Sequence, residues 1–596
     1  MQTILPVRAI ALIIFALAVA GGVPALAANH EAVVAPLGAG PFRVACSNVA
    51  QDESLIAALG STPAEIWEGR PRDGEARYIS QVLSAPATAV GYEAAVPDDR
   101  AHYPRFAGGA VAFAAIVCHP TPHSNADPDY VLPGTGDVVP HMQPAGAPPK
   151  LIGIAEHAAA YGIAVDPAPP GVPARLPLVV FSHGLGGSPI SPGYVGAMID
   201  LASQGFMVAA PFHGDPRFSR IRIEDLGNLL TVLAHFDEFV EMELLRPVSL
   251  KALVDTLLAS PAYSPGIDAG RIGGFGASLG GQAMANLLGA RLTVGLGLGC
   301  AATVQDPRIR AAVGLVPYAG QAFLPAFCND QSGAEGVDRP YLALSGTADT
   351  TAPIKMMEQA LNRFRGSRYL VALEGVPHDY RPEYRGDVMT WAVGFLDAYL
   401  QVVQDPGAIG RLVRMASVDG GPADSLRVDV HVPFAPGPDE AVVKEFFHSG
   451  LGHYFIAAGA DEIAGILAGS AGPGWELTGE AFKAFPRGPA AGAVPVCRFY
   501  GAPAGGPNSH FFTADAAECE LVKRSGGWSY EGTGFFIRPL ADGGGCPAGM
   551  LQVLRAYNQG FPRNDSNHRF TTSDSTWRDM QRHGWALEGA VMCARP

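Results

Sequence analysis

The chain has 596 residues, too many for one hydrophobic core, which predicts about two to four domains. Only 16% of its residues are charged, the formal net charge is −15, and Lys and Arg form no cluster along the sequence. Because proteins that hold nucleic acid need a basic stripe to neutralise phosphates, we expect no nucleic-acid partner.

The first 28 residues have the pattern of a secretory signal peptide. Arg8 precedes an apolar run over residues 9–20, which Gly21-Gly-Val-Pro24 ends, and Ala25-Leu-Ala27 fits a signal-peptidase site. The run is shorter than the ~20 residues that span a bilayer. We therefore expect a secreted or periplasmic protein without stable membrane insertion after cleavage, with a retained anchor as the alternative.

Eight cysteines are spread along the chain, and none forms a Cys-x-x-Cys pair, so neither a zinc site nor a redox motif is indicated. In an exported protein an even number predicts disulfides, with buried free thiols as the alternative. The expected sets are Cys46 with Cys118, Cys300 with Cys328, and four C-terminal residues whose connectivity stays open, namely Cys497, Cys519, Cys546 and Cys593.

From residue 29 to about 174 the chain is rich in Ala, Pro and Gly and weakly periodic, and residues 29–110 are the hardest to assign. Val111-Ala-Phe-Ala-Ala-Ile-Val-Cys118 is expected to be a buried strand that Pro120 and Pro122 end. We assign this region to the opening strands of a catalytic sheet and to surface loops.

The run Leu176–Ser182 is largely apolar, as expected of a central parallel strand that is buried on both faces. It leads into His183-Gly-Leu-Gly-Gly187, a glycine-rich loop that lets a backbone N–H face a cleft. The Leu185 N–H is the candidate oxyanion donor, and an ordinary strand-to-helix turn is the alternative. A helix over residues 194–204 and a strand over 205–211 follow, and this order predicts a parallel sheet.

His213 follows that strand and is expected to structure a loop or line a pocket rather than to act as a base. Residues 216–261 are expected to form one or two helices, including Leu250–Ala259, whose leucines fall at helical spacing. This segment either covers the active site as a lid or packs on the sheet, and the sequence favours neither.

Ser278 is the candidate nucleophile. It lies in Arg271-Ile-Gly-Gly-Phe-Gly-Ala-Ser-Leu-Gly-Gly281, where a G-x-S-x-G pentapeptide joins an apolar run to a helix-forming run. A serine in such a sharp turn has strained backbone angles, so Gly276 and Gly280 must be small to let the turn close. The following helix directs free N–H groups at the reaction centre, and the Leu279 N–H is the second expected oxyanion donor.

The strands expected next cover residues 308–316, 340–345 and 368–373. Asp349 follows the second of them, where a carboxylate can reach back to orient a histidine; a turn or helix-capping aspartate is the alternative. His378 follows the last strand, so the chain order Ser, Asp, His makes it the expected base. A helix over residues 386–400 is expected to close the domain.

These motifs resemble the α/β-hydrolase superfamily, and more narrowly the predicted dienelactone hydrolases related to platelet-activating-factor acetylhydrolases. The likeness rests on Leu178–Gly187, Leu201–Pro211 and Arg271–Gly281, and it covers roughly residues 110–400. It implies an α/β-hydrolase fold, with a doubly wound, mostly parallel sheet, for a catalytic domain over residues 29–403.

The chain departs from these families in two places. Position 278 is serine, where dienelactone hydrolases have a cysteine nucleophile, so lactone opening is not implied. The acetylhydrolases place their acid after the strand that here ends in Gly314-Leu-Val-Pro-Tyr318, which contains no carboxylate. Asp349, after the following strand, matches the commoner arrangement.

Residues 404–440 are rich in Pro and Gly and are expected to form an interdomain linker. In residues 441–596, three motifs recur about every 57 residues, each followed by Gly-Trp and then a glycine. The motifs are His453-Tyr-Phe, His510-Phe-Phe and His568-Arg-Phe. Three copies of one unit predict a separate, small β-rich domain with approximate threefold symmetry.

This unit resembles a repeat of unknown function that bacteria append to secreted enzymes. Its periodic aromatic residues are expected to form core, and a carbohydrate- or polymer-binding module with three equivalent aromatic sites is the alternative. One histidine per unit, without partner spacing, does not indicate a metal site.

Together these features predict an exported serine ester hydrolase, of the carboxylesterase or lipase type, that needs no metal or cofactor. Ser278, His378 and Asp349 form the expected triad, and the substrate is a small-molecule or polymeric ester. Residues 441–596 could contact a polymer or glycan. Two other functions stay open: a polymer- or carbohydrate-binding adhesive protein with an inactive hydrolase domain, and an amide or peptide hydrolase with the same triad.

Overall fold

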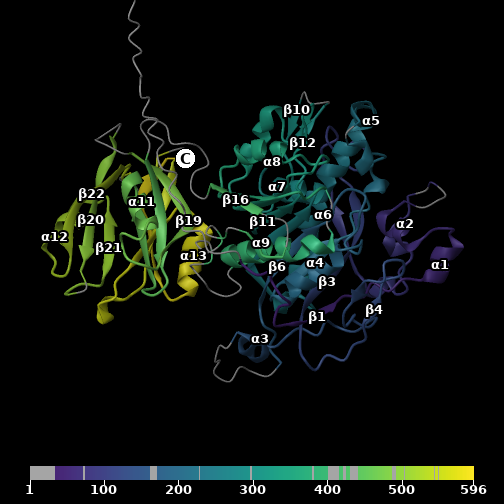
Figure 1. Ribbon diagram of the computed structural model, residues 1–596, viewed down its shortest axis with the longest axis horizontal. Coiled ribbons are helices and arrows are strands. Elements are labelled where there is room, and N and C mark those ends of the chain that lie inside the picture. Colours follow the sequence, from purple (N-terminus) through teal and green to yellow (C-terminus); the bar gives the residue numbers. More distant parts are fainter. Residues whose placement is uncertain are drawn as a thin grey trace, which may run out of the picture.

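The computed structural model describes residues 34–595 apart from several short segments. The segments left out are 71–73, 75, 162–170, 227, 296–298, 379–380, most of 401–423, 430–440, 486–491, 503, 542–543 and 548–549. The expected signal peptide, residues 1–28, also lies outside the described residues. Figure 1 shows two bodies: a larger one with helices around a sheet, and a smaller β-rich one, coloured green to yellow, from the C-terminal part of the chain.

A ten-stranded mixed sheet forms the centre of the larger body. Its order is β1-β3-β7-β6-β8-β11-β14-β15-β16, and β2 pairs with β3 off this path. The strands from β7 to β15 in this order run parallel, while β1, β2, β3 and β16 pair antiparallel. The bounds are β1 Arg43–Cys46, β2 Val90–Ala95, β3 Ala110–Thr121, β6 Leu176–Ser182, β7 Met207–Pro211, β8 Ile267–Ala277, β11 Ile309–Leu315, β14 Tyr341–Gly346, β15 Arg368–Leu373 and β16 Asp424–Asp429.

Helices and short hairpins surround this sheet. The helices are α1 Glu53–Ala58, α2 Pro63–Glu68, α3 Ile154–Ala160, α4 Tyr194–Ser203, α5 Leu229–Ala234, α6 Phe236–Ala259, α7 Leu279–Leu287, α8 Ile354–Leu361 and α9 Pro382–Leu400. The hairpins are β4 Tyr130–Val131 with β5 Val138–Val139, β9 Leu292–Val294 with β10 Gly299–Ala301, and β12 Gly320–Gln321 with β13 Leu324–Pro325.

The middle strands are buried on both faces because their side chains alternate between two apolar cores. In β6, Leu178 and Val180 pack in one core, and Val179 and Phe181 pack in the other. Residues of α6 and α7 belong to the first core, and residues of α4 and α9 to the second, so helices cover both faces of the sheet. This layering is an α/β architecture, as expected from the sequence.

Two strands differ from the sequence prediction. β3 continues through Pro120 to Thr121, because β7 pairs only with residues 115–118 and leaves the end of β3 with β1 as its single partner. Proline is tolerated at such an edge position. β16 lies inside residues 404–440, which were expected to be a linker, and it pairs with β15, so β15 is not the last strand of the sheet.

α6 is longer than expected, and it packs tightly into the larger body of the molecule. The helix begins at Phe236, well before the expected Leu250, and it contains Pro247. Most of its side chains from Phe236 to Leu257 are buried, against β2 and α7 among other elements. The lid alternative therefore does not hold for α6. The neighbouring α5 is more exposed, and Leu230 is 79% exposed there.

Four disulfides use all eight cysteines. Cys46 pairs with Cys118 across β1 and β3, and Cys300 pairs with Cys328, as expected. In the C-terminal part the bonds are Cys497–Cys519 and Cys546–Cys593. This bonding fits an oxidising compartment.

The C-terminal part contains three β-β-α-β units. In each, the first strand is the middle of a three-stranded antiparallel sheet, and the helix lies between the second and third strands. The first unit has β17 Ala441–His448, β18 His453–Ala457, α11 Ala460–Leu467 and β19 Trp475–Ala484. The second has β20 Val494–Gly501, β21 Ser509–Thr513, α12 Ala516–Arg524 and β22 Ser529–Ile537. The third has β23 Leu551–Tyr557, β24 His568–Thr571, α13 Asp574–Arg582 and β25 Ala586–Ala594.

The periodic aromatic residues pack inside this part. Phe455, Phe512 and Phe570, the third residue of each repeated motif, lie in one core shared by the three units. The tryptophan that follows each motif is half-buried against one of three clusters. His453 is buried and bonds the Asn508 carbonyl and the Asp565 carboxylate. Across the described chain, His, Cys, Asp and Glu side chains form no group of three that could hold a metal ion.

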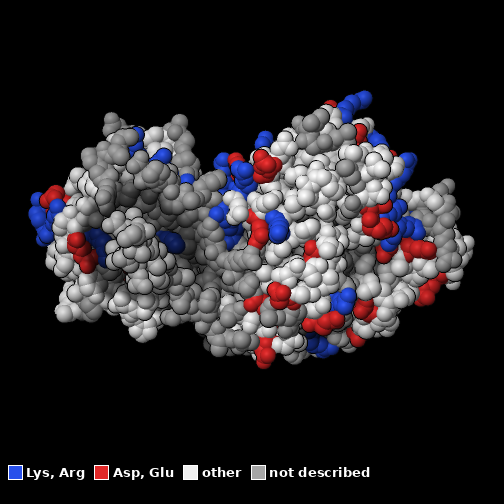
Figure 2. All heavy atoms as spheres, turned by 45° about the horizontal axis from the view of Figure 1, so that its top comes forward, with Lys and Arg blue, Asp and Glu red and all other residues white. Residues whose placement is uncertain are grey.

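Charged side chains cover a small part of the described surface that Figure 2 draws. On the face drawn in Figure 2, basic and acidic residues alternate in small groups, with broad uncharged areas between them. Of the helices in the described part of the chain, none combines the length and the apolar character needed to cross a membrane.

Candidate active site

Ser278 occupies the turn between β8 and α7, with φ 53° and ψ −118°. L residues rarely adopt a positive φ, so the neighbouring chain must impose it. A Cβ added at Gly276 would lie 2.1 Å from the Gly280 carbonyl oxygen, and one added at Gly280 would lie 1.9 Å from the Ser182 carbonyl oxygen. Only glycine fits on either side of the turn, which explains the G-x-S-x-G spacing.

Three of the sequence-predicted site residues form one hydrogen-bonded series. Ser278 Oγ lies 2.9 Å from His378 Nε2, and His378 Nδ1 lies 2.7 Å from Asp349 Oδ2. The Asp349 side chain is fully buried, that of His378 is 9% exposed, and Ser278 is 4% exposed. Such a site is largely shielded from water, which strengthens each of these polar contacts.

The loops after β14 and β15 hold Asp349 and His378 within hydrogen-bonding distance of each other. Asp349 Oδ1 accepts from the Thr351 N–H at 2.9 Å and from the Ala352 N–H at 2.7 Å, so its other oxygen is free to face His378. The Ala348 N–H donates to the Val376 carbonyl, which ties the two loops together. Asp349 thus stabilises the turn before α8 as well as contacting His378, whereas the N-cap of α8 is Pro353.

The two expected oxyanion donors lie beside the serine. Leu279 is the first residue of α7, and Leu185 lies in the loop after β6. Neither backbone N–H donates to another group among the described residues. A Cβ added at Gly184 would lie 3.5 Å from Ser278 Cβ, so this loop closes directly over the nucleophile. Unpaired N–H groups beside a nucleophile can stabilise a developing oxyanion.

The segment Gly314–Tyr318, where the acetylhydrolases have their acid, serves the serine in a different way. The Tyr318 N–H donates to the Ser278 carbonyl oxygen at 3.0 Å, and the Ser278 N–H donates to Leu315 O at 2.8 Å. These bonds help to impose the strained backbone at Ser278. The carboxylate that contacts His378 comes from the next strand instead.

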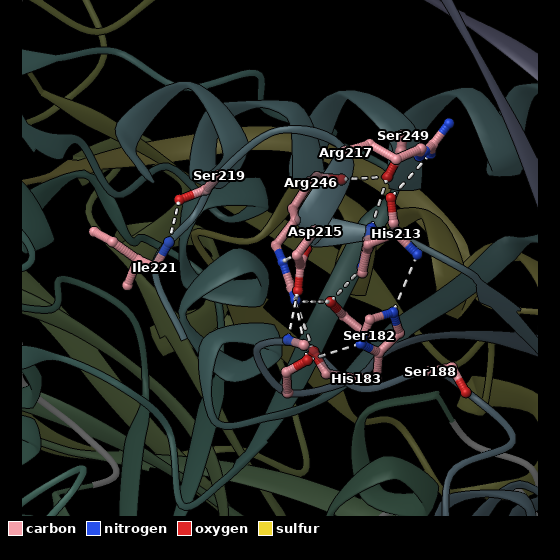
Figure 3. Close-up of polar contacts among 12 residues, drawn as sticks. Ser182, His183, Ser188, His213, Asp215, Arg217, Ser219, Ile221, Arg246 and Ser249 are labelled. Carbon is pink, nitrogen blue, oxygen red and sulfur yellow. Dashed lines mark hydrogen bonds and ion pairs between the residues drawn. The ribbon is translucent and has the colours of Figure 1, made fainter. Parts of the chain in front are cut away.

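His213 is buried in a polar cluster beneath the loop after β6 (Figure 3). Its Nε2 lies 2.8 Å from Ser182 Oγ, and its Nδ1 lies 3.1 Å from Ser249 Oγ. Because the Ser249 hydroxyl donates to the Arg246 carbonyl, it must accept from Nδ1, which leaves Nε2 as an acceptor. His213 is therefore a neutral structural residue, as expected from the sequence.

Sequence reasoning missed Arg246 and Asp215, the centre of that cluster, and also Glu243. Arg246 stands alone in an apolar stretch of α6, and Asp215 follows His213 by two residues, so neither forms a recognisable motif. Glu243 accepts from Gln282 on α7, and its burial raises its pKa to about 8. A charged residue between apolar neighbours is a sequence signal that could have found Arg246, whereas Asp215 and Glu243 each have a charged residue two positions away and carry no such signal.

Burial of two histidines predicts an acid-sensitive fold. His183 accepts the His213 N–H through Nε2, and burial, with Arg246 nearby, lowers its pKa to about 4; burial also holds the pKa of His213 well below 6.5. Unfolded histidine binds protons near pH 6.5, so the stability that these two histidines contribute is complete above that pH and falls as the pH drops towards 4. His183 alone contributes about 3 kcal/mol of this loss.

Urea unfolding followed by tryptophan fluorescence at pH 7.5, 6 and 5 checks this expectation. The raised pKa of the buried Glu243 carboxyl changes stability in the opposite direction, so the test compares the pH dependence of the wild type with that of a His183 variant. His183→Asn retains a donor for the Gly184 carbonyl but does not titrate, so it should flatten the dependence. An equally steep dependence in the variant contradicts the assignment to His183.

Two family models match parts of the chain. Residues 164–220 match the family "Platelet-activating factor acetylhydrolase, isoform II", and residues 445–595 match a "Domain of unknown function (DUF5648)". No curated protein matches the chain significantly. The first match contains β6, the Leu185 loop, β7 and Asp215, and the second contains almost all of the three repeated units. The chain is thus similar to an acetylhydrolase family over the segment that contains the Leu185 loop, and to a domain of unknown function in its C-terminal part.

Proposed function

We propose that this protein is an exported serine ester hydrolase with an α/β-hydrolase catalytic domain. The observation that carries the proposal is the unbroken hydrogen-bonded series from Ser278 through His378 to Asp349, beside two unpaired backbone N–H groups. The acetylhydrolase match over residues 164–220 supports the same reaction class. The four disulfides support export.

In this mechanism Ser278 Oγ attacks the ester carbonyl carbon while His378 Nε2 takes the hydroxyl proton. Asp349 Oδ2 accepts the Nδ1–H and so keeps Nε2 ready to receive that proton. The carbonyl oxygen becomes an oxyanion, which the Leu185 and Leu279 N–H groups bind. His378 then returns the proton to the departing alcohol, which leaves an acyl group on Ser278.

A water molecule completes the cycle. His378 takes a proton from the water as its oxygen attacks the acyl carbon, and the same two N–H groups bind the second oxyanion. Collapse of this intermediate releases the carboxylic acid and returns the proton to Ser278 Oγ. Protein groups alone carry every step, so the proposal includes no metal or organic cofactor.

For the domains we propose a catalytic unit that begins near residue 29 and a separate threefold repeat domain over residues 441–596. The catalytic unit extends past the expected end at 403, because β16 completes its sheet. Three equivalent units with a half-buried tryptophan each make the repeat domain a candidate for binding a polymer or glycan. An adhesive protein with an inactive hydrolase domain is the competing function.

A fluorophosphonate probe and a panel of p-nitrophenyl esters of increasing acyl length test the proposal on the full chain. An activated serine reacts with the probe, and an inactive domain does not. We expect labelling, and turnover of at least one ester. Absence of both would favour the adhesive function. Turnover of p-nitroanilides that exceeds turnover of the matched esters would favour an amide hydrolase.

A further inference from the structure

A buried ion pair lies beneath the loop that carries Leu185. Arg246 on α6 and Asp215 after β7 are each 2% exposed. Two guanidinium nitrogens donate to the two carboxylate oxygens, one to each. Arg246 Nε lies 3.2 Å from Asp215 Oδ1, and Nη2 lies 2.5 Å from Oδ2. Figure 3 shows the pair between α6 and the loop after β6, next to His183 and His213.

Both members of the pair also hold that loop. Arg246 Nη1 donates to the His183 carbonyl at 2.6 Å, and Nη2 donates to the Gly184 carbonyl at 3.1 Å. Asp215 Oδ2 accepts from the Gly186 N–H at 2.9 Å. The anchors therefore lie immediately before and after Leu185, whose own N–H has no partner within the described part of the chain.

Because a peptide group is planar, these anchors also set the direction of the Leu185 N–H. The Gly184 carbonyl and the Leu185 N–H belong to the same planar trans peptide, so they point in opposite directions. Fixing the carbonyl against Arg246 therefore fixes the direction of the N–H. His183 Nδ1 donates to the same carbonyl at 2.8 Å and the Gly187 N–H donates to it at 3.3 Å, so three donors hold it.

The positive charge of Arg246 also acts on the Gly184–Leu185 peptide. A cation at the carbonyl end of a peptide polarises the unit, and chains of hydrogen bonds strengthen one another in a low-dielectric interior. The Leu185 N–H should thus be a better donor than an ordinary amide. Stability alone gives little reason for the pair, because desolvating a buried ion pair costs about as much as the attraction returns.

Resting on the serine mechanism proposed above, we propose that Arg246 and Asp215 are positioning residues, which hold the Gly184–Leu185 peptide so that its N–H points at the oxyanion. Neither residue touches the substrate in this role. Their effect appears only when negative charge develops on the carbonyl oxygen, and ground-state binding does not depend on them.

Two variants test this role. Arg246→Met removes the charge and the forked donor, and Asp215→Asn keeps the shape and an acceptor for the Gly186 N–H while it removes the partner charge. We expect kcat to fall by roughly 10²-fold in Arg246→Met and by at least about tenfold in Asp215→Asn, with KM little changed, as for loss of one oxyanion donor. Rates are divided by the folded fraction from near-UV circular dichroism.

The affinity for a trifluoromethyl ketone distinguishes the positioning role from a merely structural one, because loss of stability alone would not change it. The ketone's adduct with serine places an oxyanion where the transition state does, so its affinity should weaken by the same factor as kcat/KM falls. Glu445→Gln is the matched control, because it breaks a buried Arg–carboxylate pair with Arg569 in the C-terminal part. This control should lose stability without changing kcat per folded molecule.

The possible results separate the two proposals. A wild-type protein that neither turns over esters nor binds the ketone overturns the hydrolase function itself. An active wild type whose variants keep kcat and ketone affinity per folded molecule overturns the positioning role alone. If Arg246→Met yields no folded protein, the isosteric Asp215→Asn decides between the outcomes.

Discussion

Replacing Ser278 with alanine is expected to lower ester turnover by at least about 10⁴-fold and to abolish fluorophosphonate labelling, because no other group can form the acyl-enzyme. The protein should remain folded. The Ser278 side chain bonds His378 Nε2, whereas the backbone bonds to Leu315 and Tyr318 that impose the turn do not involve the hydroxyl. Alanine is no more strained than serine at a φ of 53°.

Turnover of the most reactive p-nitrophenyl ester, measured beside thermal unfolding, checks this result. Ser525→Ala is a suitable control, since Ser525 is exposed in the C-terminal part and its hydroxyl bonds only locally. The control should keep full turnover and the same midpoint of unfolding. Undiminished turnover in a folded Ser278→Ala protein would show that another residue is the nucleophile.

The predictions that succeeded depend on local rules. β6 and β15 have the bounds expected from their apolar runs, because central parallel strands are buried on both faces and cannot tolerate polar interruptions. The turn at Ser278 follows from Gly276 and Gly280, since any side chain there would collide with backbone. Asp349 and His378 could be placed because the carboxyl ends of parallel strands meet at one edge of the sheet.

The features that sequence reasoning missed depend on distant partners. β16 is a polar edge strand, Asp-Ser-Leu-Arg-Val-Asp, and edge strands with charged side chains carry little apolar signal. Arg246 acquires its role only when α6 folds over the Leu185 loop and meets Asp215, which is 31 residues away in the chain. The pairing of Cys497 with Cys519 likewise follows from the packing of α12 on β20 and not from spacing.

Asp349→Asn should reduce kcat by about 10⁴-fold although it changes only one atom of the side chain. The backbone N–H groups of Thr351 and Ala352 both donate to Oδ1, so in the variant the amide oxygen must occupy that position. The amide nitrogen, a donor, then faces His378 Nδ1. The imidazole is thereby forced into the tautomer that carries its proton on Nε2, and it cannot accept a proton from Ser278.

A second variant separates control of the His378 tautomer from simple loss of charge. Asp349→Ala leaves Nδ1 without any protein partner and so does not enforce the wrong tautomer, while water can enter the space. We expect the alanine variant to be no less active than the asparagine variant, although it loses the bonds to Thr351 and Ala352 and should be less stable. Turnover per folded molecule in both variants is the measurement. Activity near the wild-type level in Asp349→Asn would show that the acid lies elsewhere, despite the 2.7 Å contact between Asp349 and His378.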